Sequence, residues 1–184
     1  MSESAGPDYE SMSDTQLMAE VKRGRKQAFV TLVRRHQSSL LNFFRNLGVY
    51  NDAEDLAQDT FLRLFKYRKR YQPKAKFTTF LFMIARQVRI DMLRKLKRRE
   101  DLSEQFREKA EADEVERRER REPETDVDAL LQSLPDAMRE VVVLNIYQGL
   151  RYKEISQVLG VPVGTVKSRM FHALRNMRER LDKK

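Results

Sequence analysis

Residues 152–177 read YKEISQVLGVPVGTVKSRMFHALRNM, and their spacing decides the fold of the C-terminal part of the chain. Apolar residues recur at helical intervals up to Leu159, and Gly160 follows as a residue that readily takes the left-handed conformation in which helices end. After a turn, a second helix is expected from about Val163. Its apolar stripe, spaced at about 100° per residue, predicts a buried face made of Val166, Met170, Ala173, Leu174, Met177 and Leu181. The pattern is typical of a helix-turn-helix.

The opposite face of this second helix is small, polar and basic, with one large aromatic residue. It carries Gly164, Thr165, Ser168, Phe171, His172 and Arg175, with Lys167 and Arg169 on its flanks. A DNA major groove accepts a helix whose N-terminal residues reach base edges, and thymine methyl groups offer apolar contact to a ring. Gly164 and Thr165 would leave backbone N–H groups open to a phosphate. This face predicts that the helix binds in a DNA major groove and contacts base edges. The alternative is that it is an ordinary surface helix of a basic protein.

The composition of the whole chain indicates an all-α protein. Of 184 residues only 6 are Gly and 5 are Pro, and the 35% that are charged alternate with apolar residues at helical intervals. The net charge of +9 favours a polyanionic partner. With no Cys and only two His, we expect no disulfide, no metal site and no cofactor. Because no apolar run could span a bilayer and no signal pattern begins the chain, we expect a cytoplasmic protein without membrane insertion.

The charges are distributed in blocks that suggest a division into domains. Residues 100–126 contain twelve acids against six cations and few large apolar residues, so we interpret them as an acidic linker. This linker would join a helical domain at 13–99 to the helix-turn-helix domain at 127–184, and the polar residues 1–12 are expected to be disordered. The core of the second domain is expected to include Leu130, Leu131, Leu134, Met138, Val141, Val142, Leu144, Ile146 and Tyr147.

A helix of the first domain, beginning at Asn51 or Asp52, carries acids on one side. Acids in a first turn suit the positive end of the helix dipole. Asp55, Asp59 and Leu62, however, share the face opposite the apolar stripe. A face of acids around an exposed Leu can dock onto a basic protein surface, so both interpretations stay open.

Two later segments of the first domain have a composition suited to nucleic acid. Residues 67–77 combine cations with three aromatic rings, which fits the binding of a single strand as well as it fits a solvated loop. A helix from Thr78 to about Arg99 has apolar residues on both faces and cations that increase towards its end. This pattern is typical of a helix that packs in a bundle and lies on a polyanion, or of a buried helix whose basic end reaches solvent.

Three motifs, in this order, resemble those of the extracytoplasmic-function sigma factors of bacterial RNA polymerase. They are DAEDLAQDTFLRLFK at 52–66, FTTFLFMIARQVRIDMLRK at 77–95, and LP at 134–135 followed by GLRYKEI at 149–155 and GVPVGTVKSR at 160–169. The resemblance covers nearly the whole chain. The chain departs from the family pattern at three positions, Phe80 for Trp, Gln87 for Asn and His172 for Arg, which leaves the promoter sequence open.

The resemblance implies a role for each part of the chain, with catalysis left to the polymerase. It implies contact with the core polymerase by Asp52, Asp55, Gln58, Asp59 and Leu62. It implies recognition and opening of the minus-10 element by Tyr71, Lys74, Lys76, Phe77, Thr79, Phe80, Arg86, Gln87, Arg89 and Arg94. It implies reading of the minus-35 element by Gly164, Thr165, Lys167, Ser168, Arg169, Phe171, His172 and Arg175. The expected partners are core polymerase, promoter DNA in double-stranded and melted form, and an anti-sigma factor.

The residues alone leave a second class open, a repressor or activator that uses the same helix-turn-helix with a signal-binding N-terminal half. An enzyme is rejected because no nucleophile, base or metal cluster converges in the sequence. Transcription with core polymerase would indicate a sigma factor, whereas protection of a palindromic site by the chain alone would indicate a repressor.

Overall fold

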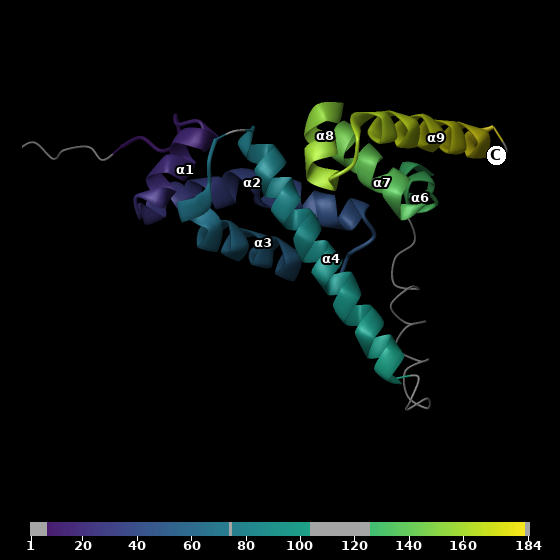
Figure 1. The fold of residues 1–184 in the computed structure, drawn as a ribbon, viewed down its shortest axis with the longest axis horizontal. Helices are drawn as coiled ribbons and strands as arrows, with labels where there is room; N and C mark the ends of the chain where they lie inside the picture. Colours follow the sequence, from purple (N-terminus) through teal and green to yellow (C-terminus); the bar gives the residue numbers. More distant parts are fainter. Residues whose placement is uncertain (1–6, 74, 104–125, 183–184) are drawn as a thin grey trace, which may run out of the picture.

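The computed structural model describes residues 7–73, 75–103 and 126–182, and the regular structure in these ranges is entirely helical, as the composition predicts. The N-terminal group comprises α1 (Asp14–Lys22), α2 (Lys26–Asn46), α3 (Ala53–Tyr67), the short 3₁₀ turn η1 (Arg68–Arg70) and α4 (Phe77–Ser103). The C-terminal group comprises α6 (Asp126–Gln132), α7 (Asp136–Val142), the π-helical turn η3 (Val143–Tyr147), α8 (Tyr152–Leu159) and α9 (Val163–Leu181). Figure 1 shows the long helix α4 running from the N-terminal group past α8 and out beyond the other helices.

Local signals in the first domain act as the sequence predicts. Ser13 caps α1, because its Oγ accepts from the Gln16 N–H at 3.3 Å while the Gln16 Oε1 accepts from the Ser13 N–H at 2.8 Å. Gly48 follows α2 with a φ of 83°, in the region that favours glycine. The expectation of disorder over 1–12 is wrong for residues 7–12, since Tyr9 and Met12 pack partly buried against the core.

The helix α4 is longer than expected and continues to Ser103, into the segment interpreted as a linker. The physical reason is local: residues 96–103 contain good helix formers and neither Gly nor Pro, so nothing in the backbone ends the helix at Arg99. The remainder of the expected linker, 104–125, lies outside the described residues, as do residues 1–6 of the expected disordered terminus.

The helix-turn-helix forms where the sequence places it. Gly160 ends α8 in the left-handed conformation with a φ of 67°, and α9 begins at Val163. Three residues of the predicted stripe, Val166, Met170 and Ala173, are buried against α7 and α8. Leu174 and Leu181 are instead 50% and 53% exposed, so their assignment to the core is wrong. Periodicity gives the phase of an apolar stripe, but burial also requires a neighbouring element at that height of the helix.

A second error in the predicted core lies in η3. Leu144 is buried as expected, whereas Ile146 is 58% and Tyr147 is 40% exposed. The wider π-helical turn shifts the angular position of each residue relative to an α-helix, so apolar residues spaced for a buried α-helical face rotate towards solvent.

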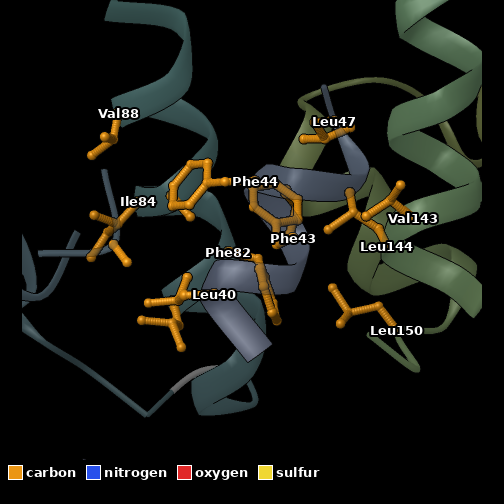
Figure 2. Packing of buried hydrophobic residues seen from close by; sticks show 14 of the residues in the cluster. Leu40, Phe43, Phe44, Leu47, Phe82, Ile84, Val88, Val143, Leu144 and Leu150 are labelled. Atoms are coloured by element: carbon orange, nitrogen blue, oxygen red, sulfur yellow. The ribbon is translucent and has the colours of Figure 1, made fainter. Parts of the chain in front are cut away.

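The two groups of helices share one hydrophobic core. In Figure 2, Phe43 and Phe82 of the N-terminal group lie on the side of Leu144 and Leu150 of the C-terminal group, while the Phe44 ring points towards Ile84 and Val88. Along this boundary α4 packs against α8, and α2 contacts both α6 and η3.

Polar contacts extend this boundary. The Ser39 hydroxyl donates to the Gln148 Oε1 at 2.6 Å, and the Gln132 amide donates to the Asn46 carbonyl at 3.2 Å. The Gln132 side chain also lies close to the backbone of Gly48, because a Cβ on Gly48 would lie 3.1 Å from the Gln132 Oε1. The two domains are therefore packed against each other over apolar and polar groups.

Candidate protein-binding and DNA-binding surfaces

The acidic side of α3 is open to solvent. Asp52 precedes the helix as its N-cap residue, Asp55 and Gln58 are exposed, and Leu62 is 59% exposed. The buried residues of the helix lie on the other side, namely Ala53, Leu56, Ala57, Thr60, Phe61 and Leu64. The sequence-predicted residues of this group thus share one accessible face, which we call the α3 face (Asp52, Asp55, Gln58, Asp59 and Leu62).

One residue of the α3 face is held by an internal ion pair. The Arg63 Nη2 lies 3.0 Å from the Asp59 Oδ2, and the Arg63 Nη1 lies 2.6 Å from the Asp91 Oδ2 on α4. The hydrogen bond with Asp91 raises the pKa of Arg63, and the same bond lowers the pKa of Asp91. Asp55, in contrast, makes no ion pair with any residue that the structure describes. Asp55 and the equally exposed Asp52 are therefore the carboxylates of this face that are available to a partner.

Three residues that the family resemblance assigns to the minus-10 element are buried where the basic loop meets α4. Tyr71, Phe77 and Thr79 are 6%, 3% and 1% exposed. The Tyr71 ring lies 5.2 Å from the Phe80 ring and 6.4 Å from the Phe77 ring, and burial raises the pKa of its phenol. The structure therefore places these three side chains in the core beside the basic loop, and their assignment to the minus-10 element stays a prediction.

Other predicted minus-10 residues are accessible to different degrees. Gln87 and Arg94 are exposed, and Phe80 is half-buried beside Tyr71. Lys76 is exposed and pairs with Glu154 of the second domain at 2.9 Å. Lys74 lies outside the described residues.

Two arginines of α4 face the second domain. Arg86 is half-buried, and its Nε lies 3.3 Å from the Glu140 Oε1. Arg89 is only 4% exposed and pairs with both Asp136 and Glu140. These two acids were not among the residues predicted from the sequence. Their spacing of four residues, which places both on one side of α7, was the signal that could have identified them.

The outward face of α9 collects the predicted minus-35 residues. Lys167, Ser168, His172 and Arg175 are exposed, Thr165 and Arg169 are half-exposed, and Phe171 is 65% exposed. The Phe171 and His172 rings meet edge to face with centroids 5.5 Å apart. A Cβ on Gly164 would meet nothing within 4 Å, so the start of the helix is open. We call this surface the α9 face (Gly164, Thr165, Lys167, Ser168, Arg169, Phe171, His172 and Arg175).

These surfaces define a helical protein of two domains with an exposed recognition helix, the class of helix-turn-helix DNA-binding proteins. Comparison with known families narrows the class. Residues 32–99 match sigma-70 region 2, and residues 124–177 match sigma-70 region 4. None of the helices within 7–73, 75–103 and 126–182 has the length and apolar character needed to cross a membrane.

Individual proteins resemble the chain over most of its length. The RNA polymerase sigma-H factor of Pseudomonas aeruginosa is 34% identical, with 92% of each chain covered. The ECF RNA polymerase sigma factor SigW of Bacillus subtilis is 31% identical over 88% of this chain and 93% of its own. CnrH, whose structure was solved in complex with the cytosolic domain of CnrY, is 27% identical with a TM-score of 0.70, covering 92% of this chain and 97% of that one.

The chain belongs to the extracytoplasmic-function sigma factors of the sigma-70 family. It therefore acts in promoter-specific initiation of transcription as a sigma subunit of RNA polymerase. The resemblance read from the sequence motifs is confirmed, and the repressor alternative is not supported. Sigma factors are initiation factors and not enzymes.

Proposed function

We propose that each surface described above performs one step of initiation. The α3 face docks onto a basic surface of the core polymerase. The exposed cations around the start and middle of α4, with Phe80, hold the opened minus-10 strand. The α9 face enters the major groove of the minus-35 element. The reaction itself is carried out by the polymerase in the cytoplasm.

The observation that carries this proposal is the geometry of α9. Its inner side is buried through Val166, Met170 and Ala173, which fixes the rotation of the helix about its axis. With that rotation, Phe171 and the cations beside it point outward on a helix that begins directly after the turn. A helix presented in this way can enter a major groove without rearrangement of its own domain. Phe171 supplies an apolar surface for a thymine methyl, and Lys167 and Arg169 supply cations for phosphates or base edges.

The test is run-off transcription with core polymerase on promoters selected from a randomised library by the wild-type holoenzyme. Phe171→Ala should reduce transcription on the selected promoters by about 10–100-fold, which corresponds to the roughly 1–3 kcal/mol typical of a base-specific contact. Leu181→Ala is the matched control, since Leu181 is 53% exposed on the same helix but lies outside the α9 face. Equal loss in both variants would show that the effect is not one of DNA reading.

The two kinds of contact on α9 can be separated by their salt dependence. Lys167→Ala should weaken binding to all sequences alike and reduce the slope of affinity against salt by about one. Phe171→Ala should leave that slope unchanged, because the ring neutralises no phosphate. A reduced salt slope in the Phe171 variant would contradict the assignment of this ring to a base.

We further propose that an anti-sigma factor binds this chain. The support is the similarity to CnrH, which was solved in complex with the cytosolic domain of CnrY. Large exposed apolar side chains in both domains, among them Leu93 and Leu174, would provide contact area for such a protein. Co-purification with a protein that abolishes run-off transcription would support the proposal, and Leu174→Asp should weaken that inhibition.

A further inference from the structure

Two aromatic rings join the start of α2 to the end of α3. The Phe29 ring lies 5.1 Å from the Phe65 ring, and both side chains are partly buried against the core. Lys26 and Arg25 precede Phe29 by three and four residues, the separations at which side chains on a helix are neighbours. The start of α2 therefore brings two exposed cations to this pair of rings. Figure 1 shows α1 and the turn that follows it on the side of the molecule away from α9.

The end of α3 brings two more cations to the same pair of rings. The Arg68 guanidinium lies over the Phe65 ring, 4.0 Å from its centroid, and the Arg68 Nη1 donates to the Phe65 carbonyl at 2.8 Å. Lys69 is exposed and follows Phe65 by four residues. Cations from two segments that are about forty residues apart in the sequence thus meet in one place. We call this surface the basic end patch (Arg25, Lys26, Arg68 and Lys69).

The fold does not neutralise the basic end patch. Within the ranges that the structure describes, Arg25, Lys26 and Lys69 form no ion pair. Asp14 and Glu20, the two acids of α1, already pair with other arginines. The first turn of α2 contains no acid. The cations of this patch are therefore available to an anion from outside the chain.

The stability of the fold does not account for the two cations at the start of α2. The N-terminal end of a helix carries a partial positive charge, so Arg25 and Lys26 stand where cations are unfavourable. Arg25 is the N-cap residue, yet its side chain makes no capping hydrogen bond. A small polar residue or an acid would stabilise the helix better at this end. Residues that break a local rule of stability in this way are expected at functional sites.

The position of the patch in the chain indicates which anion it meets. The turn η1 ends at Arg70, and the loop before α4 begins at the next residue, Tyr71. The Tyr71 N–H donates to the Tyr67 carbonyl at 3.1 Å, which ties the start of this loop to the end of α3. The patch therefore continues the surface assigned above to the opened minus-10 strand. A row of cations along one path is the arrangement that holds the backbone of a single strand.

We propose that the basic end patch binds phosphates of the opened DNA strand where this strand continues beyond the minus-10 element. The inference rests on the proposed function, because it takes the start of α4 and the loop before it as the site of the minus-10 strand. Lys26 and Lys69 supply point charges, which position a phosphate backbone without reading its bases. The patch thus holds a longer piece of the opened strand, and its contribution is independent of the promoter sequence.

The experiment uses holoenzyme made from core polymerase and the full chain, with Lys26→Gln and Lys69→Gln combined. The double variant removes one cation from each side of the ring pair, and neither cation belongs to an ion pair of the described residues. Loss of a cation from the start of a helix is favourable, so the variant should unfold at the wild-type temperature or above it.

The probe is a fluorescent single strand that the wild-type holoenzyme selects from a randomised pool, trimmed to the shortest form that is still bound. The same strand is also extended at either end by about eight thymidines, a length within the range that one single-strand-binding domain covers. The trimmed strand reports the minus-10 surface. The extended strands report the basic end patch.

Wild-type holoenzyme should bind one of the two extended strands more tightly than the trimmed strand. For a single strand, the slope of log affinity against log salt changes by about 0.7 for each phosphate contact, so the double variant should lose about 1.4 from this slope. Its disadvantage on the extended strand should therefore shrink about sevenfold as salt rises from about 50 to about 200 mM. Binding of the trimmed strand should not change.

Arg178→Gln with Arg180→Gln is the matched control, because these two cations are exposed on α9 and lie outside the α9 face. An equal loss in this control would show general electrostatics and overturn the patch. Extension that brings no gain to the wild type, or the same gain to the double variant, also overturns it. Tight binding of the trimmed strand in that case leaves the proposed function standing.

Two further outcomes separate the patch from its alternatives. If wild-type holoenzyme selects no single strand from the pool, the proposed role of the minus-10 surface fails together with the patch. If the double variant assembles more weakly with core polymerase but keeps the full gain from extension, the patch meets an acidic protein surface and the assignment to DNA is wrong. Titration of labelled sigma factor with core polymerase measures this assembly.

Discussion

Reversal of the charge at Asp55 tests the α3 face with the least disturbance of the fold. Asp55 is exposed in the first turn of α3 and forms no ion pair with the residues described. A surface substitution of this kind costs about 0.5 kcal/mol or less, and an arginine at the positive end of the helix dipole adds about 0.3–1 kcal/mol. Asp59 is the weaker choice, because its replacement would also break the pair with Arg63.

Binding should respond far more strongly than stability. If the Asp55 carboxylate meets cations of the core polymerase, Asp55→Arg places like charges together, which costs several kcal/mol. A loss of about 3 kcal/mol corresponds to a Kd raised about 100-fold. The loss of binding free energy would thus be at least about twice the loss in the free energy of unfolding, which is about 1.5 kcal/mol or less.

The assay is titration of fluorescently labelled sigma factor with core polymerase, with thermal unfolding measured on the same samples. Glu54→Arg is the matched control. Glu54 is also an exposed acid of the first turn, so its replacement changes the interaction with the helix dipole equally. Glu54 lies about 100° around the helix axis from Asp55. An Asp55→Arg variant that binds core polymerase as tightly as the Glu54→Arg variant would refute docking through this face.

Three further predictions concern stability. Leu144→Ala should lower the free energy of unfolding by about 2–5 kcal/mol, because Leu144 is 1% exposed in the shared core. Ile146→Ala in the same turn should change the free energy of unfolding by about 0.5 kcal/mol or less. Urea unfolding measures both changes. Gly160→Ala should cost about 1–2 kcal/mol at its φ of 67°. Gly164→Ala, in open space on α9, should instead be stabilising, by up to about 1 kcal/mol, because alanine has less conformational freedom in the unfolded chain. Burial alone would raise the pKa of Asp14, but hydrogen bonds from His36 and Arg35 outweigh burial and lower this pKa. The ionised carboxylate therefore stabilises the fold at pH values above its unfolded pKa. This contribution is lost as the pH falls through the folded pKa. Asp14→Asn should therefore flatten the acid side of the stability curve, and an unchanged acid limb in thermal unfolding would contradict the pairing.

The features predictable from the sequence are those fixed by near neighbours along the chain. Ser13 and Gln16 cap α1 through residues three apart, and Gly160 ends α8 because its own backbone conformation requires it. The outward direction of Phe171 follows from the period of the buried stripe behind it. The acidic face of α3 follows in the same way. Each of these depends on a helix and its own termini, which local spacing describes well.

The features that escaped prediction depend on contacts between distant segments. Tyr71 has the composition of a DNA-stacking residue, and only the fold shows that its ring is enclosed by Phe77 and Phe80. Ile146 has the spacing of a core residue, and only the π-helical turn shows that it faces solvent. Arg89 has the position of a solvent-exposed cation, and only the fold shows that two acids of α7 pair with it in a buried place. No pattern along one helix contains this information.

Two arginines of α4, Arg86 and Arg89, are paired with acids of the second domain. Cations that lie close together repel each other unless an anion is present, and the repulsion grows when apolar neighbours exclude water. Arg86 and Arg89 lie on α4 beside Phe82 and Ile84, which join the shared core, so this cluster is partly dry even in the free protein. Acids supplied by α7 neutralise it without a permanent ligand. Because Arg86 and Arg89 would repel each other in this partly dry place without Glu140 and Asp136, the ion pairs with α7 stabilise the packing of the two domains.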